Sequence, residues 1–320
     1  MSTIKNIVHH AYLAGANSQN NLRTDNLPGV PGQHKVTTQA RHQRGVTLLE
    51  LMVGIAIGLL VVAVAMGALM VSRGVSGTVS DASQIQQQAA YAMRVIGTQL
   101  RQAGALRVNL NYDAAVVAEP YQAKVAIETD APATGGNAFS PSTSPSIQGT
   151  ATSMTVGYRR YKEPLHAKAN EESQSRNCVG GPADNTGSHK DDQLLESLFT
   201  FNASKNDLRC GGNGAASQPI VNNVANFQVR YLLQDNSVGG DSKISTVAAS
   251  SLASTDWPRV QGVEVCLVLY GNESMDLPSG SNYTDCDGST QDMSTQTGDR
   301  ARRMHMVFRN VFQLRSQGLI

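Results

Sequence analysis

The longest apolar stretch of the chain runs over residues 51–72, LMVGIAIGLLVVAVAMGALMVS, and its 22 residues carry no charge. At about 1.5 Å of rise per residue, such a helix is roughly 33 Å long, which is enough to cross the hydrocarbon core of a bilayer. The stretch is too long for the apolar region of an ordinary secretory signal, and no Ala-x-Ala cleavage site follows it. It therefore predicts a membrane helix that stays in the mature protein.

After Arg73 the apolar pattern becomes one-sided. Small and apolar residues recur at steps of three or four, and Gln and Arg residues occupy the positions between them. This spacing is that of one face of an α-helix. We predict that the helix continues over residues 73–106 as an amphipathic segment, with this face packed on a sheet. The residues of the face are Ile85, Ala89, Ala92, Ile96, Leu100 and Ala103.

Beyond Gly104 the pattern changes to short runs typical of strands, separated by polar loops over residues 134–149, 167–193 and 271–300. A long helix followed by many short strands indicates an α+β fold, with an antiparallel sheet behind the helix. We therefore predict a β-rich head over residues 107–320. The strand-like runs are Ala114–Val117, Lys124–Thr129, Ser153–Tyr161, Leu198–Asn202, Gln218–Leu233, Val260–Tyr270 and Met304–Arg315.

Charge is unevenly distributed along the chain. Residues 1–45 contain five basic residues and one acidic residue, whereas the rest of the chain contains 21 basic and 24 acidic ones. A basic segment before an apolar helix keeps the N-terminus in the cytoplasm and sends the residues after the helix across the membrane. Charged residues are only 16% and aromatic residues 5% of the chain. This composition favours a β-rich domain with polar loops outside the cytoplasm over a compact enzyme.

The four cysteines, Cys178, Cys210, Cys266 and Cys286, all lie beyond the apolar stretch. No pair has CxxC spacing, so a structural metal site is not predicted. An even number of cysteines on an exported domain favours two disulfides. Three pairings are possible from sequence alone. We prefer Cys178–Cys210 and Cys266–Cys286, because each pair is adjacent in chain order.

Glu50 stands one position before the uncharged run. A carboxylate at a membrane boundary is costly and usually functional, although one at the interface can also reach back to water. The residues around it, Arg44-Gly45-Val46-Thr47-Leu48-Leu49-Glu50-Leu51-Met52, resemble the type III signal of type IV prepilins and pseudopilins. In that family a basic leader ends in Gly, the fifth mature residue is Glu, and the usual first mature residue is Phe. This chain departs from the pattern at Val46.

The resemblance implies that prepilin peptidase cuts between Gly45 and Val46, so that residues 1–45 are a cleaved leader, longer than is usual in the family. It also implies N-methylation of the new α-amine of Val46, which keeps its positive charge. Glu50 would then form the assembly salt bridge with that amine on a neighbouring subunit. The helix over residues 46–72 would hold the precursor in the inner membrane as a single span, with a periplasmic head, before it enters the filament core.

Segments of the head resemble PilW-type minor pilins. Each segment is loose by itself, but they follow one another in the order found in that family, and the resemblance covers most of residues 44–315. The segments are Ser153–Tyr158, Asn177–Gly180, Leu208–Cys210, Pro219–Tyr231, Trp257–Leu269 and Arg302–Asn310.

No enzyme signature accompanies these features. The sequence contains no nucleophile elbow, phosphate-binding loop or dinucleotide fingerprint, and we predict neither catalytic residues nor a cofactor. The acidic stretch over residues 285–292 lacks the ligand spacing of an EF-hand, so we interpret it as a solvated loop. The head also lacks the basic, aromatic-laced patch of a nucleic-acid interface.

The resemblance favours a minor pilin that initiates type IV pilus assembly near the tip. Its implied partners are the major pilin, other minor pilins, prepilin peptidase, the inner-membrane assembly platform and a tip adhesin. A J-type pseudopilin of a type II secretion system is the alternative, and a membrane-anchored periplasmic enzyme comes third. The 275 residues after the predicted cut are many for a pseudopilin, which favours the pilus.

Overall fold

The fold was obtained as a computed structural model, which describes residues 45–108, 127–128, 135–140, 146–238 and 241–314. The predicted leader up to residue 44 and the predicted strand over residues 114–117 lie outside the described residues. The structure divides into two units, residues 1–60 and 61–320.

One helix, α1 (Leu48–Gln102), belongs to both units and runs through its 55 residues without a break. It ends where Gly104 adopts a left-handed conformation with φ of 67°, which glycine accepts without a steric penalty. The N–H of Gly104 then donates to the carbonyl of Gly157, over 2.9 Å. The chain thus leaves the helix alongside the strand that contains Gly157.

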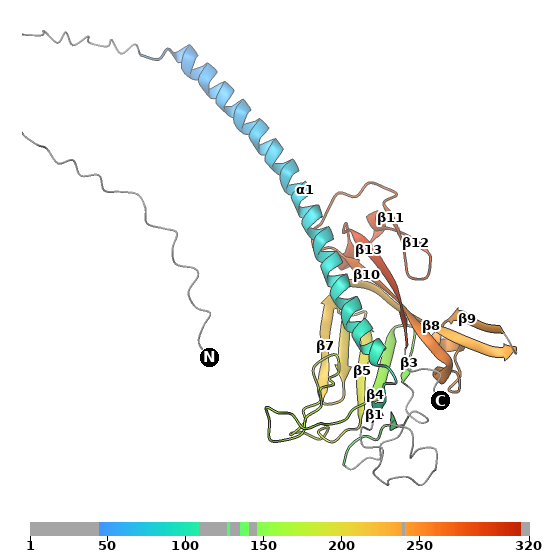
Figure 1. Cartoon of the computed structure of the whole chain (residues 1–320). Coiled ribbons are helices and arrows are strands. Elements are labelled where there is room, and N and C mark those ends of the chain that lie inside the picture. The colour runs from blue at the N-terminus through green and yellow to red at the C-terminus, as the bar shows by residue number, and fades with distance from the viewer. Residues whose placement is uncertain (1–44, 109–126, 129–134, 141–145, 239–240, 315–320) are drawn as a thin grey trace, which may run out of the picture. The chain divides into compact units, whose positions relative to one another are not determined.

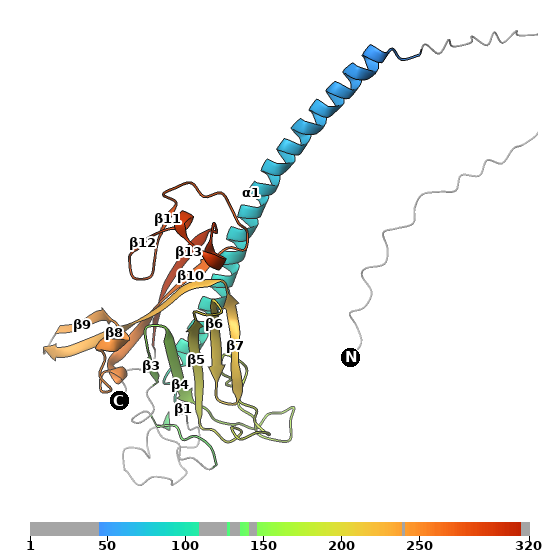
Figure 2. The same ribbon diagram turned by 180° about the vertical axis from the view of Figure 1, so that it is seen from behind.

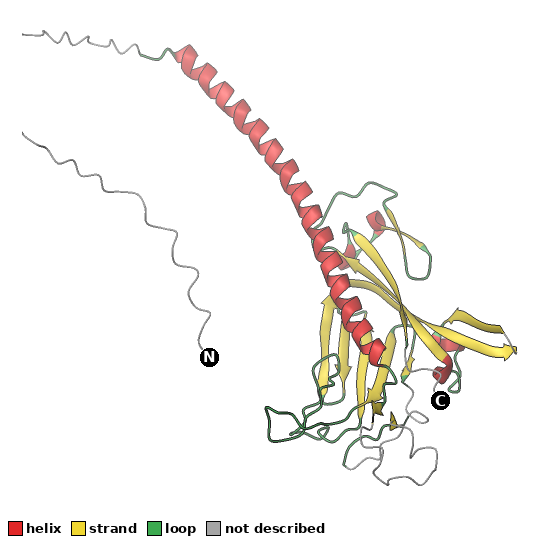
Figure 3. Cartoon of the chain, in the orientation of Figure 1, coloured by secondary structure: helices red, strands yellow, loops and turns green. Residues whose placement is uncertain are grey.

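The buried face of α1 is the one that the sequence predicts. Its six residues are each at most 2% exposed, and they form one hydrophobic core with residues of both larger sheets. In this unit, the second half of α1 lies in front of the strands in Figure 1 and behind them in Figure 2. The helix therefore covers one face of the sheets, which gives the predicted α+β arrangement (Figure 3).

Every strand pairing in the described head is antiparallel. A five-stranded sheet, in order from edge to edge, contains β3 (Ile147–Gly149), β4 (Ser153–Arg159), β5 (Leu194–Asn202), β6 (Asp207–Gly212) and β7 (Ala215–Asn222). A four-stranded sheet, also in order from edge to edge, contains β13 (His305–Gln313), β10 (Val260–Tyr270), β8 (Val224–Val238) and β9 (Asp241–Val247).

The smaller elements are two strand pairs and four 3-10 turns within the described residues. The strand pairs are β1 (Arg107–Val108) with β2 (Ile127–Glu128), and β11 (Asn282–Thr284) with β12 (Thr290–Asp292). The turns are η2 (Ala249–Ser251), η3 (Trp257–Arg259), η4 (Met293–Thr295) and η5 (Gly298–Arg300).

The single strand predicted over residues 218–233 is wrong. Asn223 has a φ of 58° and separates β7 from β8, which belong to different sheets. Asparagine tolerates this conformation better than most residues. Apolar residues occur on both sides of it, at Ile220–Val221 and at Val224–Ala225, so the hydrophobic pattern does not show the break.

Several short strands were also missed by the pattern. The predicted loop over residues 134–149 contains β3, and the predicted loop over residues 271–300 contains β11 and β12. β6 and β9 fall between predicted strands. β6 carries Asp207, Arg209 and two glycines, and the exposed positions of β9 are mostly polar. Pairing with neighbouring strands, rather than local pattern, makes these segments extended.

Candidate assembly site

The chain enters α1 through a threonine cap. The N–H of Leu51 donates to the carbonyl oxygen of Thr47 over 3.1 Å. The N–H of Glu50 donates to Thr47 Oγ1 over 3.3 Å. Thr47 is therefore the N-cap and Glu50 the third helical residue, the spacing of a capping box. This local role is missing from the sequence-based interpretation of Glu50, although the TLLE pattern is readable in the sequence.

The predicted cut lies just before this cap. Gly45 and Val46 have no regular secondary structure and are exposed. No atom lies within 4 Å of the point where a Cβ on Gly45 would stand. A peptide bond in such a segment can enter a protease site in an extended form, whereas a bond inside α1 would first have to unfold from the helix.

Glu50 suits the electrostatics of this helix end. The first turn of a helix carries a partial positive charge, which a carboxylate stabilises and an ammonium group destabilises. A cut after Gly45 would place a new α-amine directly before the cap residue. Glu50 is exposed in the first turn, so its carboxylate can compensate the helix end and also meet an amine from another chain.

The side chains after Glu50 are apolar and uncovered. Every described side chain from residue 46 to residue 74 is exposed. Among the described residues, α1 is the one helix long and apolar enough to cross a membrane. Gly54 and Gly58 have the spacing that lets two membrane helices approach closely, and no atom occupies the space above either glycine. An apolar surface of this length needs lipid or other helices to cover it.

Two disulfides lie in the head. Cys178 is bonded to Cys210, and Cys266 is bonded to Cys286 with an S–S distance of 2.07 Å. Cys210 lies in β6 and Cys266 in β10. Each bridge therefore attaches a loop to a strand of one of the two larger sheets.

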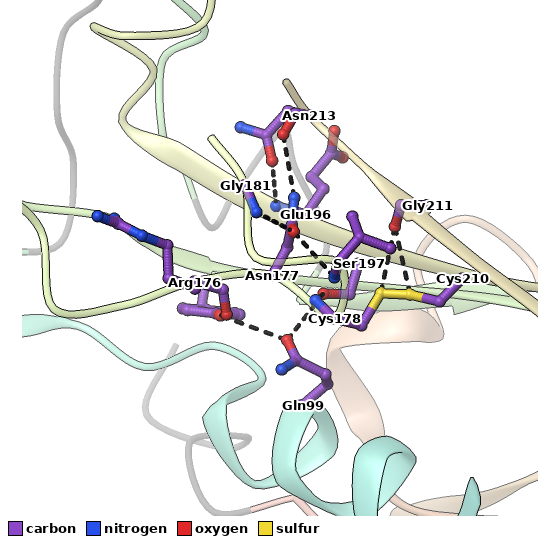
Figure 4. The surroundings of a disulfide bond; sticks show 12 residues. Gln99, Arg176, Asn177, Cys178, Gly181, Glu196, Ser197, Cys210, Gly211 and Asn213 are labelled. Carbon is purple, nitrogen blue, oxygen red and sulfur yellow. Dashed lines mark hydrogen bonds between the residues drawn. A yellow bond between two sulfur atoms is a disulfide. The ribbon is translucent and has the colours of Figure 1, made fainter. Parts of the chain in front are cut away.

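The first disulfide is connected to α1 through a buried glutamine (Figure 4). Gln99 Oε1 accepts hydrogen bonds from Ser197 Oγ over 2.7 Å and from the Tyr158 hydroxyl over 3.3 Å. Ser197 Oγ in turn accepts the N–H of Cys178 over 3.1 Å. The Tyr158 hydroxyl also lies 2.8 Å from the carbonyl of Arg176. Gln99 therefore joins the helix, two strands and the disulfide loop.

A second polar contact attaches α1 to the head, at Asp81. This carboxylate is 3% exposed and accepts the N–H groups of Asn272, over 2.8 Å, and Glu273, over 3.3 Å. A Cβ on Gly271 would stand 1.8 Å from Asp81 Oδ2. The loop after β10 can therefore reach the helix only with glycine at this position. The apolar pattern gave no signal for this contact. Asp81 stands four residues before Ile85 and continues the buried face of the helix, but its side chain is a carboxylate.

Comparisons with known families give one match at the start of the long helix and a second match in the head. Residues 40–66 match the model of the prokaryotic N-terminal methylation motif, and residues 186–316 match that of the type IV pilus-assembly protein W family. The first match contains the cap and Glu50, and the second begins shortly before β5 and ends after β13. The chain is a PilW-type pilin-like protein.

Comparisons with individual proteins add little to this assignment. No curated protein matches the chain. A solved type IV-like pilin from Thermus thermophilus is 14% identical to the PilW-type chain, with a TM-score of 0.27. The match covers 54% of this chain and 84% of the Thermus protein. A TM-score this low does not establish a shared fold, so the assignment depends on the two family matches.

Pilin families consist of structural subunits and not of enzymes. The methylation motif implies interaction with prepilin peptidase and with other pilins, and a membrane-anchored precursor that becomes part of a pilus. No group of three or more His, Cys, Asp or Glu side chains suited to a metal ion occurs among the described residues.

Proposed function

We propose that this PilW-type protein is a minor pilin, which helps to initiate the type IV pilus and stays near its tip. The proposal depends on one observation above all. A capped helix start with an exposed Glu50 directly precedes a long, uncovered apolar surface. Such a surface suits lateral packing with like helices, first in the membrane and then in a filament.

In this proposal the precursor spans the inner membrane once, with residues 1–45 in the cytoplasm and the head in the periplasm. The basic segment before the helix favours this orientation. The two disulfides are compatible with an oxidising compartment. Peptidase then cuts after Gly45, and the α-amine of Val46 is methylated while it keeps its charge.

Glu50 then pairs with the methylated amine of a neighbouring subunit. The pair lies among apolar helices, where an unpaired charge costs several kcal/mol. The partner is therefore selected by charge as well as by packing. Other minor pilins and the major pilin supply the neighbouring helices, and the assembly platform adds subunits beneath them. The head, at the other end of α1, is free to carry a tip adhesin.

A gene deletion tests this assignment, with surface pili, twitching motility and secreted exoenzymes scored in the same strain. We expect loss of pili and twitching with normal secretion, and recovery when the intact gene is supplied. A deletion that blocks secretion but leaves pili intact would contradict the proposal and favour the J-type pseudopilin.

A further inference from the structure

A polar cavity lies in the head, and its lining includes none of the residues that the assembly role uses. Its volume is about 750 Å³, in the range of sites for small molecules. It is lined by the turn between β6 and β7, by the segment from Pro182 to His189, and by Asn137 and Glu196. These side chains come from regions far apart in the sequence, and the fold brings them to one end of the five-stranded sheet.

A buried carboxylate organises the wall of this cavity. Asp192, 5% exposed, accepts hydrogen bonds from the Asn137 backbone over 3.1 Å, from Asn213 Nδ2 over 2.8 Å and from His189 Nδ1 over 2.8 Å. Burial opposes its charge, but hydrogen bonds from Asn213, Asn137 and His189 prevail and lower the pKa of the Asp192 carboxyl. Asp192 is therefore ionised at neutral pH and can only accept hydrogen bonds.

This contact fixes the tautomer of His189. Because the Asp192 carboxylate can only accept, the proton of a neutral His189 ring must be on Nδ1. The other ring nitrogen, Nε2, then has a free lone pair, and the imidazole is 41% exposed where it lines the cavity. In its neutral form, His189 offers the cavity a hydrogen-bond acceptor.

The carboxylate of Glu196 is a second hydrogen-bond acceptor in the cavity, and it can carry a negative charge. Its backbone N–H donates to Asn213 Oδ1 over 2.9 Å, but its carboxylate has no hydrogen-bond donor or ion-pair partner within the described residues. Burial, followed by the nearby charge of Asp192, raises the pKa of the Glu196 carboxyl. A positive charge beside Glu196 would stabilise its ionised form and so oppose both causes of the raised pKa.

Four cations described in this part of the head bind other carboxylates. None of the described residues that line the cavity is lysine or arginine. Lys162 and Lys190 lie within 3.6 Å and 3.3 Å of Asp191 carboxylate oxygens. Two arginines bind the buried Asp184 carboxylate instead. These are Arg160 and Arg176.

We propose that this cavity binds a small polar ligand through a primary ammonium group, with Glu196 as the ion partner and His189 Nε2 as a hydrogen-bond acceptor. An ammonium group supplies three donors and one positive charge, which matches a wall whose free side-chain groups accept hydrogen bonds. An amino sugar and a free lysine side chain share this chemistry. The site is independent of Glu50 and the apolar helix, so its failure would leave the assembly role intact.

Binding can be measured on the mature, detergent-solubilised chain by ligand-observed NMR and calorimetry. The probes are glucosamine and Nα-acetyl-lysine amide, each compared with its N-acetylated, uncharged counterpart. We expect at least one amine to bind at least about tenfold more tightly than its counterpart, and the amine that does so identifies the source. Equal binding of charged and acetylated forms, or no binding of either amine at millimolar concentration, would overturn the proposal.

Two variants locate the site. Glu196→Gln should weaken amine binding at least about tenfold, because it removes the ion partner. Glu163→Gln removes the same charge from an exposed side chain that does not line the cavity, and should bind as the parent chain does. Equal losses in both variants would assign the effect to net charge and contradict the site.

A third variant guards against misfolding of Glu196→Gln. Ala216 lines the cavity at an exposed position, so Ala216→Arg should fold and place a guanidinium near Glu196. We expect this variant to lose amine binding while it keeps both disulfides and the parent thermal midpoint. Full amine binding by a correctly folded Ala216→Arg chain would also overturn the proposal.

Discussion

Glu50 has two separable tasks in the structure and in the proposed filament. Its backbone N–H completes the cap at Thr47, and its carboxylate is exposed in the first turn of α1. A side-chain substitution at residue 50 keeps this N–H. A change at Thr47 therefore tests the cap, and a change at Glu50 tests the charge.

We expect Glu50→Gln to be cut by the peptidase as the parent is, but to enter pili at least about tenfold less, because it leaves the neighbour's amine unpaired. Thr47→Ala removes the cap, which costs about 1 kcal/mol at a helix end, and should enter pili nearly normally because the charge remains. Immunoblots of membranes and of sheared pili measure both steps. Normal incorporation of Glu50→Gln would exclude the salt bridge.

His305 predicts a pH dependence of stability. It is 4% exposed, stacks on Tyr283 with ring centroids 5.0 Å apart, and its Nδ1 lies 2.9 Å from the Arg303 carbonyl. Burial, reinforced by the charge of Arg300, lowers its pKa below the usual 6.5, against opposing effects of Arg303 and Asp285. The native state therefore binds its proton less readily than the unfolded chain does.

The stabilising contribution of neutral His305 is complete above pH 6.5 and is lost as the pH falls through the lower native pKa. We expect the free energy of unfolding to decrease from about pH 7 towards about pH 5, by at most about 1.4 kcal/mol per pH unit. Chemical unfolding at several pH values measures this slope. His305→Gln should flatten the slope, whereas His166→Gln, at an exposed position, should not. An unchanged slope in His305→Gln would rule out this residue as the cause.

At the scale of the element, α1 shows what periodicity can and cannot predict. The apolar steps from Ile85 to Ala103 placed the buried face correctly, because burial of one helix face requires that spacing. Asp81 and Gln99 stand on the same face, four residues before Ile85 and three after Ile96, but hydrophobic periodicity does not mark polar residues. Their contacts depend on which loop meets the helix, which is a property of the tertiary fold.

Gly97 marks a close approach between α1 and the edge strand β13. A Cβ on Gly97 would stand 2.6 Å from the Phe312 ring. Alanine favours helices by about 1 kcal/mol over glycine, but overpacking typically costs about 1–3 kcal/mol. We expect Gly97→Ala to lower the free energy of unfolding, and Gly97→Ala with Phe312→Leu to recover part of the loss.

Gly77 provides the matched control on the same helix. The nearest atom to its added Cβ is Glu273 Cγ at 3.9 Å, an ordinary contact. Gly77→Ala should therefore raise the free energy of unfolding by about 0.5–1 kcal/mol. Equal stabilisation by both alanines in urea unfolding would show that the Phe312 contact is not tight.

At the scale of the whole molecule, the two disulfides make the head depend on its redox compartment. Each closes a loop, with sequence separations of 32 and 20 residues. Replacing either pair by serines should lower the free energy of unfolding by about 2–4 kcal/mol. Alkylation before and after reduction, followed by mass spectrometry, counts the bonded thiols. Four thiols that react without reductant in the exported protein would contradict this expectation.

The long apolar helix, its packed face and the α+β class were all predictable from sequence, because each depends on local hydrophobic pattern. The break at Asn223 and the strands β6 and β9 were not, since backbone conformation and strand pairing decide them. The cavity beside His189 was also beyond prediction. Its walls come together only once Asp192 gathers side chains from three loops.

The two polar contacts on α1 have a mechanical consequence. Asp81 and Gln99 are 18 residues apart, which is about 27 Å along a helix axis. A pull along the helix, as a retracting fibre would apply, loads both contacts and the apolar face between them at the same time. Bonds loaded in parallel share the tension, whereas bonds loaded in sequence break one by one. The head is therefore attached to α1 in a way that resists shear.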